Sequence, residues 1–158
     1  MKRSEYLTKA ALIAALYIVL SFVSNLFGLS SGVIQFRLSE ALCLLPMFTS
    51  AAVPGLAIGC LLTNILCGGI VIDVVFGSLA TLAGAYFAYL LREKPVYVAA
   101  LPTILINAIV IGPVLAFAYG AQEGLIYLMA SVALGEFVCA GVLGSLLAAE
   151  LKKRNFRI

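Results

Sequence analysis

Residues 41–72, ALCLLPMFTSAAVPGLAIGCLLTNILCGGIVI, form a run of 32 residues without a charged side chain. A helix that crosses a membrane needs about 20 apolar residues, so this run is too long for one helix and short for two. Pro54 and Gly55 lie near its middle, where proline removes a backbone donor and glycine loosens a helix. The run therefore predicts two short helices, at about residues 38–52 and 54–68.

The composition of the whole chain indicates an integral membrane protein. Hydrophobic residues make up 64% of the 158 residues and charged residues 11%, whereas soluble domains contain about 45–50% and about 25%. A soluble protein this apolar could not cover its surface with polar groups. The composition thus excludes a soluble enzyme, a disordered chain and a nucleic-acid-binding protein.

Some kinds of chemistry are also excluded. The sequence has no histidine, so histidine-dependent catalysis and the usual zinc sites cannot occur. It also lacks a Walker lysine loop, the phosphate-binding device of many ATPases. We therefore expect no catalytic residues, no metal site and no cofactor of its own, and we interpret the four cysteines as small buried hydrophobic residues.

Four other apolar runs each fit one crossing, which brings the expected number of helices to six. The prediction is an all-α bundle of six transmembrane helices in a single domain, residues 1–158, with helices at about residues 7–28, 38–52, 54–68, 73–92, 96–118 and 124–150.

The distribution of lysine and arginine predicts the orientation of the bundle. With six crossings and both termini in the cytoplasm, nine of the ten basic residues face the cytoplasm and only Arg37 lies outside. Five crossings would place the basic C-terminus outside and are disfavoured. A re-entrant hairpin at residues 41–72 would make no net crossing and would leave every basic segment on the same side as six crossings do. It therefore stays open as an alternative.

One acidic residue is predicted to lie deep in the membrane. Glu136 comes about 18 Å into the last helix at the usual helical rise. A charged group at this depth costs about 2.5–3.5 kcal/mol and usually faces the protein interior. Asn107 reaches a similar depth, and Thr103 lies one turn earlier on the same face. These side chains could line one cavity, although a protonated Glu136 bonded to a neighbouring helix is the alternative.

Other polar residues gather where the outer mouth is expected, namely Arg37, Glu40, Asn64, Asp73 and Glu123. Acids predominate there, and fixed carboxylates around a pocket would favour a cationic or donor-rich solute. Two simpler roles stay open as alternatives: an ion pair between Arg37 and Glu40 at a helix start, and capping of its own helix by Asp73.

Small residues recur at a spacing of four on the first helix, as Ala10, Ala11, Ala14 and Ala15. Such faces let helices approach closely. They serve either the packing of this bundle or contact with another subunit.

Four segments resemble one family of membrane transporters, the queuosine-precursor transporter (QueT) family. They are IQFRLSEAL at residues 34–42 followed by Leu45-Pro46, Gly59 with Asn64-Ile65-Leu66, DVVFGSLAT at residues 73–81, and Gly135-Glu136. The resemblance covers nearly the whole chain, and its first segment is the most specific.

The resemblance implies the substrate-capture (S) component of an energy-coupling factor importer in the cell membrane of a prokaryote. Such a component works with a transmembrane coupling (T) subunit and two cytoplasmic ATPase subunits, which use the ATP. The alanine face of the first helix, here Ala10 with Ala14 and Ala11 with Ala15, would meet the coupling subunit. Gln35, Phe36 and Arg37 would lie in the loop that borders the pocket.

The implied solute is a 7-deazaguanine, and 7-aminomethyl-7-deazaguanine fits best. We expect Glu136 or Glu40 to accept the N–H groups of the guanine edge, and Asp73 or the other glutamate to accept the ammonium. Asn107 and Asn64 would contact the carbonyl. Phe36 would stack on the base.

Other functions remain as alternatives. The nearest is an S component for another vitamin-like solute such as riboflavin, thiamine or biotin, because one fold can serve many functions. An integral-membrane enzyme is less consistent with acids that are scattered along the chain. A structural subunit or channel, in which Glu136 would be only a packing or pore group, is a third alternative.

Overall fold

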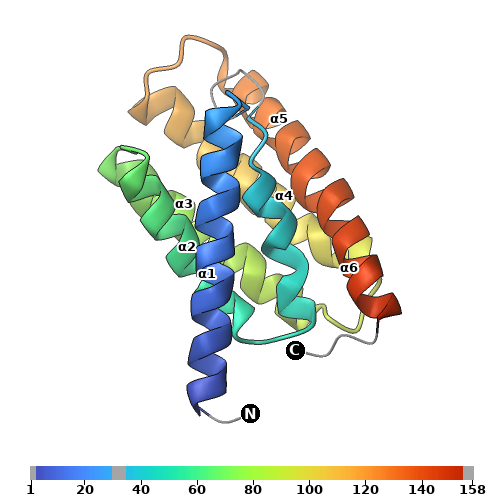
Figure 1. Cartoon of the computed structure of the whole chain (residues 1–158). Coiled ribbons are helices and arrows are strands. Elements are labelled where there is room, and N and C mark those ends of the chain that lie inside the picture. Colours follow the sequence, from blue (N-terminus) through green and yellow to red (C-terminus); the bar gives the residue numbers. More distant parts are fainter. Residues whose placement is uncertain (1–2, 30–34, 155–158) are drawn as a thin grey trace.

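The computed structural model describes residues 3–29 and 35–154, whose regular structure is entirely helical. Lys2 and Arg157, which entered the orientation argument, and Ile34 of the first family segment lie outside these residues. The elements, shown in Figure 1, are α1 (Arg3–Leu26), the 3-10 helix η1 (Leu38–Met47), α2 (Ala52–Leu66), α3 (Val71–Leu90), α4 (Val96–Pro113), the π-helical turn η2 (Val114–Ala118), α5 (Leu125–Glu136), the π-helical turn η3 (Phe137–Leu143) and α6 (Gly144–Lys153).

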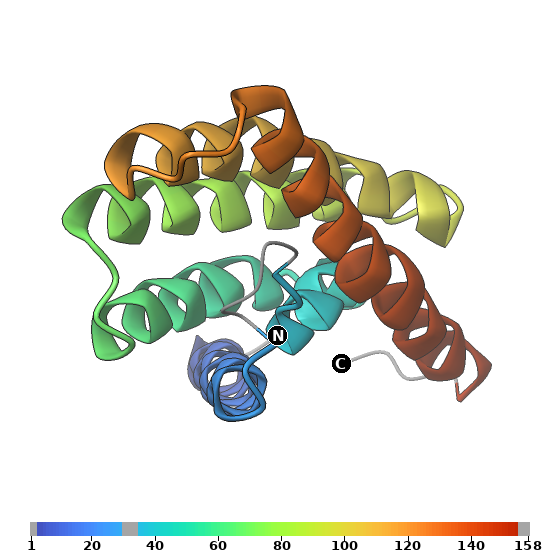
Figure 2. The same ribbon diagram turned by 90° about the horizontal axis from the view of Figure 1, so that it is seen from above.

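The segments run alternately up and down, so that α1 begins and α6 ends at the same end of the bundle (Figure 1). Seen from above in Figure 2, neighbouring segments pack in chain order, with α1 on α2, α2 on α3, α3 on α4 and α4 on α5. The short η1 lies among them and touches α1, α2, α3, α4, α6 and η3. It is therefore the central segment of the bundle.

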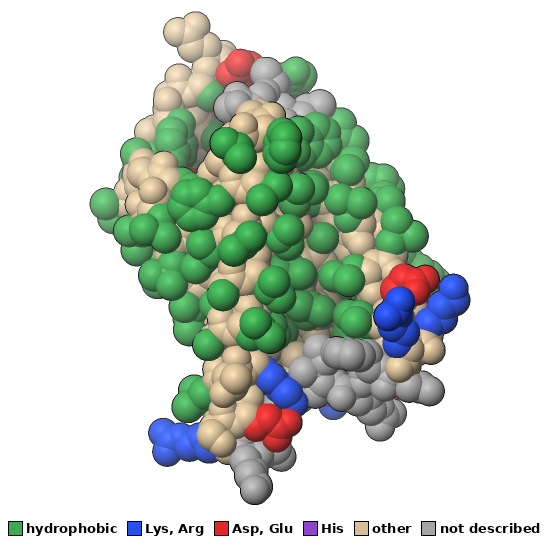
Figure 3. Space-filling view, viewed as in Figure 1, with side chains coloured by type: hydrophobic (Ala, Val, Ile, Leu, Met, Phe, Trp, Pro, Cys, Tyr) green, Lys and Arg blue, Asp and Glu red, His purple; other side chains and the backbone are tan. Residues whose placement is uncertain are grey.

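Four helical segments are long and apolar enough to cross a membrane: Arg3–Leu26, Val71–Leu90, Val96–Ala118 and Leu125–Lys153. The first two are α1 and α3, and the others join α4 to η2 and α5 to α6 through η3. Hydrophobic side chains cover most of the face in Figure 3, while the Lys and Arg side chains visible there gather at its lower end. This is the surface expected of a protein whose middle lies in lipid.

The run of residues 41–72 forms two short helices, as predicted; η1 is shorter than the predicted 38–52, whereas α2 has the predicted length and begins two residues earlier. The 10 residues of η1 extend about 20 Å, and the 15 residues of α2 about 22 Å. Each is thus shorter than the hydrocarbon core of about 30 Å.

The predicted break at Pro54 and Gly55 is wrong. The chain turns at residues 48–51, and Pro54 occupies the first turn of α2. Proline is tolerated there because an N–H group in the first turn has no intrahelical partner. Gly55 is needed for close packing, since a Cβ at this position would lie 2.7 Å from the carbonyl oxygen of Ala10.

Contact with α2 buries one of the two alanine pairs of α1 and leaves the other exposed. Ala10 and Ala14 are buried against α2, where a Cβ on Gly59 would lie 3.1 Å from the carbonyl oxygen of Ala14. Ala11 and Ala15 are exposed. The alternative of internal packing therefore applies to Ala10 and Ala14, and only the second pair is available to a partner.

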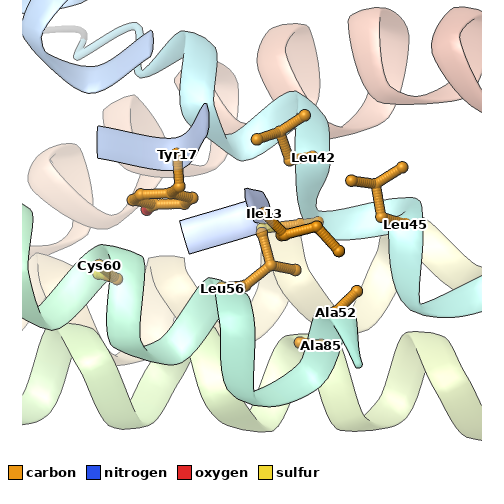
Figure 4. Close-up of a cluster of buried hydrophobic side chains, with 9 residues drawn as sticks. Ile13, Tyr17, Leu42, Leu45, Ala52, Leu56, Cys60 and Ala85 are labelled. Atoms are coloured by element: carbon orange, nitrogen blue, oxygen red, sulfur yellow. The ribbon is translucent and has the colours of Figure 1, made fainter. Parts of the chain in front are cut away.

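The buried apolar side chains beside this contact form the cluster in Figure 4, which joins Ile13 and Tyr17 of α1 to residues of η1, α2 and α3. Apolar surface contributes about 25 cal/mol per Å² to stability only when folding removes it from water. In lipid, close packing between helices therefore contributes a larger share of the stability. The cluster fixes the positions of the helices that surround the polar site.

Candidate functional site

A polar cavity of about 360 Å³ lies between the ends of α1, α2, α3 and α4 that are opposite the chain termini. Its volume is within the range of small-molecule sites, about 300–1,000 Å³. The lining residues are Ser21, Asn25, Gln35, Arg37, Thr63, Asn64, Cys67, Gly68, Gly69, Asp73, Ile111, Leu115 and Tyr119. Four of them, Gln35, Arg37, Asn64 and Asp73, were predicted to bind substrate.

Arg37 and Asp73 are the charged side chains in this lining. The guanidinium of Arg37 donates a hydrogen bond of 2.9 Å to Oδ1 of Asn64. The Nδ2 group of Asn64 lies 3.4 Å from the carbonyl oxygen of Asp73, to which it donates. The buried side-chain amide of Asn64 thus links the guanidinium of Arg37 to the backbone of Asp73. The side chains of Arg37 and Asp73 form no ion pair with each other.

This lining corrects the expectation of a predominantly acidic pocket. One cation and one carboxylate face the same space, so a ligand that carries both a positive charge and a hydrogen-bond acceptor would satisfy both.

The carboxylate of Asp73 is held by Tyr119, which follows η2. The phenolic hydroxyl of Tyr119 donates to Oδ2 of Asp73 at 2.9 Å and accepts from the backbone N–H of Ile70 at 3.4 Å. Burial and the bond to Asp73 raise the pKa of Tyr119 above its usual value, so the phenol remains a neutral donor at physiological pH. Asp73 is in the first turn of α3, as predicted, but its side chain bonds to Tyr119 rather than capping the helix.

The loop that carries Arg37 is held from two sides. On α1, Oγ of Ser24 accepts the backbone N–H of Leu38 at 2.9 Å. On α5, the carbonyl oxygen of Gln35 would lie 2.2 Å from a Cβ on Gly135, so only glycine allows this approach. Gly135 directly precedes Glu136, so the loop and the acid are positioned by the same contact.

Glu40 lies outside the cavity lining and has its own buried partners. Its side chain, 1% exposed, accepts hydrogen bonds from the hydroxyl of Tyr17 and, at 2.8 Å, from Sγ of Cys43. The predicted pairing of Arg37 with Glu40 at a helix start is therefore replaced by the bond from Arg37 to Asn64. The chain turns between them, and η1 carries Glu40 into the centre of the bundle.

Glu136 is buried, with 8% of the residue exposed, and does not line the cavity. Its carboxylate interacts with the side chain of Asn107, as the sequence suggested, and with the charges of Glu40 and Arg37. Its Oε2 has no hydrogen-bond partner among the described residues. Buried acceptors without partners are uncommon, so this oxygen has unused hydrogen-bonding capacity.

The remaining predicted residues are placed apart from the cavity. Asn107 and Thr103 are buried, with Thr103 against Gly84, and Phe36 is half-buried within the loop, between Gln35 and Arg37. Within residues 3–29 and 35–154, no cluster of three or more Cys, Asp or Glu side chains could hold a metal ion.

Sequence reasoning missed several lining residues, among them Asn25, Thr63 and Tyr119. Thr63 has a buried hydroxyl without a partner in the described chain. Because Thr63 is next to Asn64 in the sequence, it could have been predicted as a lining residue. Tyr119 could not, because tyrosines at helix ends are common at membrane surfaces and do not indicate a binding site.

Comparison with known proteins gives two matches. The chain matches the QueT transporter family over residues 7–153. It is also 34% identical over 96 residues to the queuosine precursor transporter QueT of Lactococcus lactis subsp. cremoris (strain MG1363), a match that spans 60% of this chain and 56% of the relative. No solved structure is significantly similar.

The partners of Glu40 lead to a prediction about stability. Changing Tyr17 to Phe removes the hydroxyl and leaves a buried carboxylate oxygen without its donor, which costs about 1–3 kcal/mol. We expect Tyr17→Phe to lower the melting temperature of the detergent-purified protein. The matched control is Tyr127→Phe, at an exposed position. Equal melting temperatures for both variants would show that the Tyr17–Glu40 bond does not stabilise the bundle.

Proposed function

This chain belongs to the QueT transporter family, and we propose that it is the substrate-capture (S) component of an energy-coupling factor importer for a queuosine precursor. Its multi-pass membrane bundle and the name of the L. lactis relative support a transport role. The observation that carries the proposal is the polar cavity that opens at one end of the bundle, with Arg37 and Asp73 held apart in its wall.

The ligand that we assign to this cavity is 7-aminomethyl-7-deazaguanine. Its carbonyl oxygen and its ammonium group project from the same edge of the ring system. The guanidinium of Arg37 can donate to the carbonyl, since arginine commonly binds guanine O6. The carboxylate of Asp73 can accept from the ammonium in a charge-assisted hydrogen bond. The separation of the two charged groups by Asn64 supports this pairing.

We extend the assignment to the buried acid. The Watson–Crick edge of the ligand also carries two kinds of N–H donor, the ring N–H and the exocyclic amine, and a carboxylate can accept from both. Glu136 offers an oxygen without a partner and lies near both Arg37 and Glu40. Asn107 beside it would orient the carboxylate. In this arrangement Glu40 does not contact the ligand. Its hydrogen bond with Tyr17 instead holds η1 against α1 next to the site.

The direction of uptake follows from charge placement. The cavity lies at the end of the bundle opposite Lys9, Lys152 and Lys153. Basic residues favour the cytoplasmic side, so we assign the cavity to the outside of the cell.

Coupling to ATP hydrolysis requires a surface for another membrane subunit. We assign this surface to α1, where Ala11 and Ala15 are exposed one turn apart and would allow a helix of the coupling subunit to approach closely. Two ATPase subunits would act through that coupling subunit.

Titration with 7-aminomethyl-7-deazaguanine tests the site. Asp73→Asn and Glu136→Gln each remove a charged acceptor and are expected to weaken binding about tenfold or more, because hydrogen bonds to charged groups contribute about 1.5–3 kcal/mol. Glu123→Gln, an exposed acid, is the matched control and should bind like the unchanged protein. Isothermal titration calorimetry of the purified protein provides the affinities.

Two results would contradict the proposal. The first is unchanged affinity in both variants, which would remove these acids from the site. The second is stronger binding of riboflavin, thiamine or biotin than of the deazaguanine, which would favour another vitamin-like solute.

The exposed alanine pair generates a separate prediction for transport. The double variant Ala11→Leu/Ala15→Leu should abolish uptake of the radiolabelled ligand in cells that contain the coupling and ATPase subunits, while the purified variant still binds it. Ala130→Leu, an exposed alanine on α5, should support uptake. Loss of binding in the double variant would instead make these alanines part of the internal packing.

A further inference from the structure

The start of α3 departs from the usual arrangement of a helix N-terminus. Ile70 is the N-cap residue and Asp73 the third residue of the helix. An acid at this position commonly accepts the backbone N–H of the N-cap residue, as in a capping box. Here the N–H of Ile70 donates instead to the hydroxyl of Tyr119. The carboxylate of Asp73 is therefore not used to cap its own helix.

The hydroxyl of Tyr119 lies between the two groups and fixes one face of the carboxylate. It has a single hydrogen, and the bond from Ile70 occupies one of its lone pairs, so the hydrogen is directed at Oδ2 of Asp73. The hydrogen bonds of the described residues leave Oδ1 open. This oxygen lies on the side of Asn64 and Gly77, since a Cβ on Gly77 would be 3.3 Å from it and 3.0 Å from Nδ2 of Asn64.

The π-helical turn η2 explains how Tyr119 reaches α3. The backbone N–H of Tyr119 bonds to the carbonyl of Val114, five residues earlier, at 3.1 Å. A wide turn of this kind inserts one residue and rotates the chain beyond it, and such turns are frequent at functional sites. Leu115 of the same turn lines the cavity. The irregular end of this helix thus places a phenol at the cavity wall.

We propose that Tyr119 is a positioning residue that aims the free oxygen of Asp73 into the cavity and so makes the site selective for a primary ammonium group. This inference rests on the proposed function, which assigns a deazaguanine to the cavity. Tyr119 acts through Asp73: it supplies the N-cap amide with an acceptor, and it supplies Oδ2 with a donor that keeps the carboxylate from rotating.

A double-mutant cycle with two ligands tests this role. The ligands are 7-aminomethyl-7-deazaguanine and 7-cyano-7-deazaguanine, which lacks the positive charge. Tyr119→Phe should weaken binding of the amine about tenfold and change binding of the nitrile less than about twofold, because only the ammonium uses Asp73. In the Asp73→Asn background, Tyr119→Phe should have no further effect. Tyr127→Phe on α5 is the matched control and should leave both affinities unchanged.

Affinities that differ from these expected values would contradict different parts of the proposal. If Tyr119→Phe weakens both ligands equally, or still weakens the amine when Asp73 is Asn, Tyr119 does not act through Asp73 and the inference is wrong. If Asp73→Asn itself binds both ligands like the unchanged protein, the ligand assignment under the proposed function is wrong, and the inference fails with it. Melting temperatures of all variants identify any loss of affinity that is due to unfolding.

Discussion

The hydrogen bond from Arg37 to Asn64 is the interaction on which the polar site depends. A guanidinium and a carboxylate in a membrane bundle would gain most by direct contact, since the low dielectric strengthens their attraction. Asn64 prevents this by accepting from Arg37 and donating to the backbone at Asp73. The two charges consequently face a shared cavity with unused hydrogen-bonding capacity, which a ligand of complementary charge can satisfy.

The bundle provides this geometry through short and irregular segments. Because η1 is only 10 residues long, the loop before it reaches into the bundle and carries Arg37 to the cavity. The contact of Gln35 with Gly135 holds that loop against α5 beside Glu136. The π-helical turn η2 brings Tyr119 to the start of α3. The long regular helices α1 and α3 form the frame, and departures from regularity position the polar groups.

Much of the fold could be predicted from the sequence, because apolar length and the placement of basic residues are strong signals in membranes. The two short helices were foreseen, as was a polar group containing Arg37, Asn64 and Asp73, which line the cavity. The break between the two helices lies a few residues before Pro54, because proline is tolerated within the first turn of a helix and does not mark its boundary. The burial of Glu40 under Tyr17 and the role of Tyr119 depend on contacts between segments 23 and 46 residues apart, which spacing along one helix does not reveal.

The most direct test of the ligand assignment uses Cys67, which lines the cavity and is exposed, whereas Cys43, Cys60 and Cys139 are buried. The rate at which a maleimide labels the purified protein therefore reports access to the cavity. Saturating 7-aminomethyl-7-deazaguanine should slow the labelling of Cys67, and biotin at the same concentration should not. If the deazaguanine binds by calorimetry and Cys67 is still labelled at the rate of the ligand-free protein, the ligand binds elsewhere and the central claim is wrong.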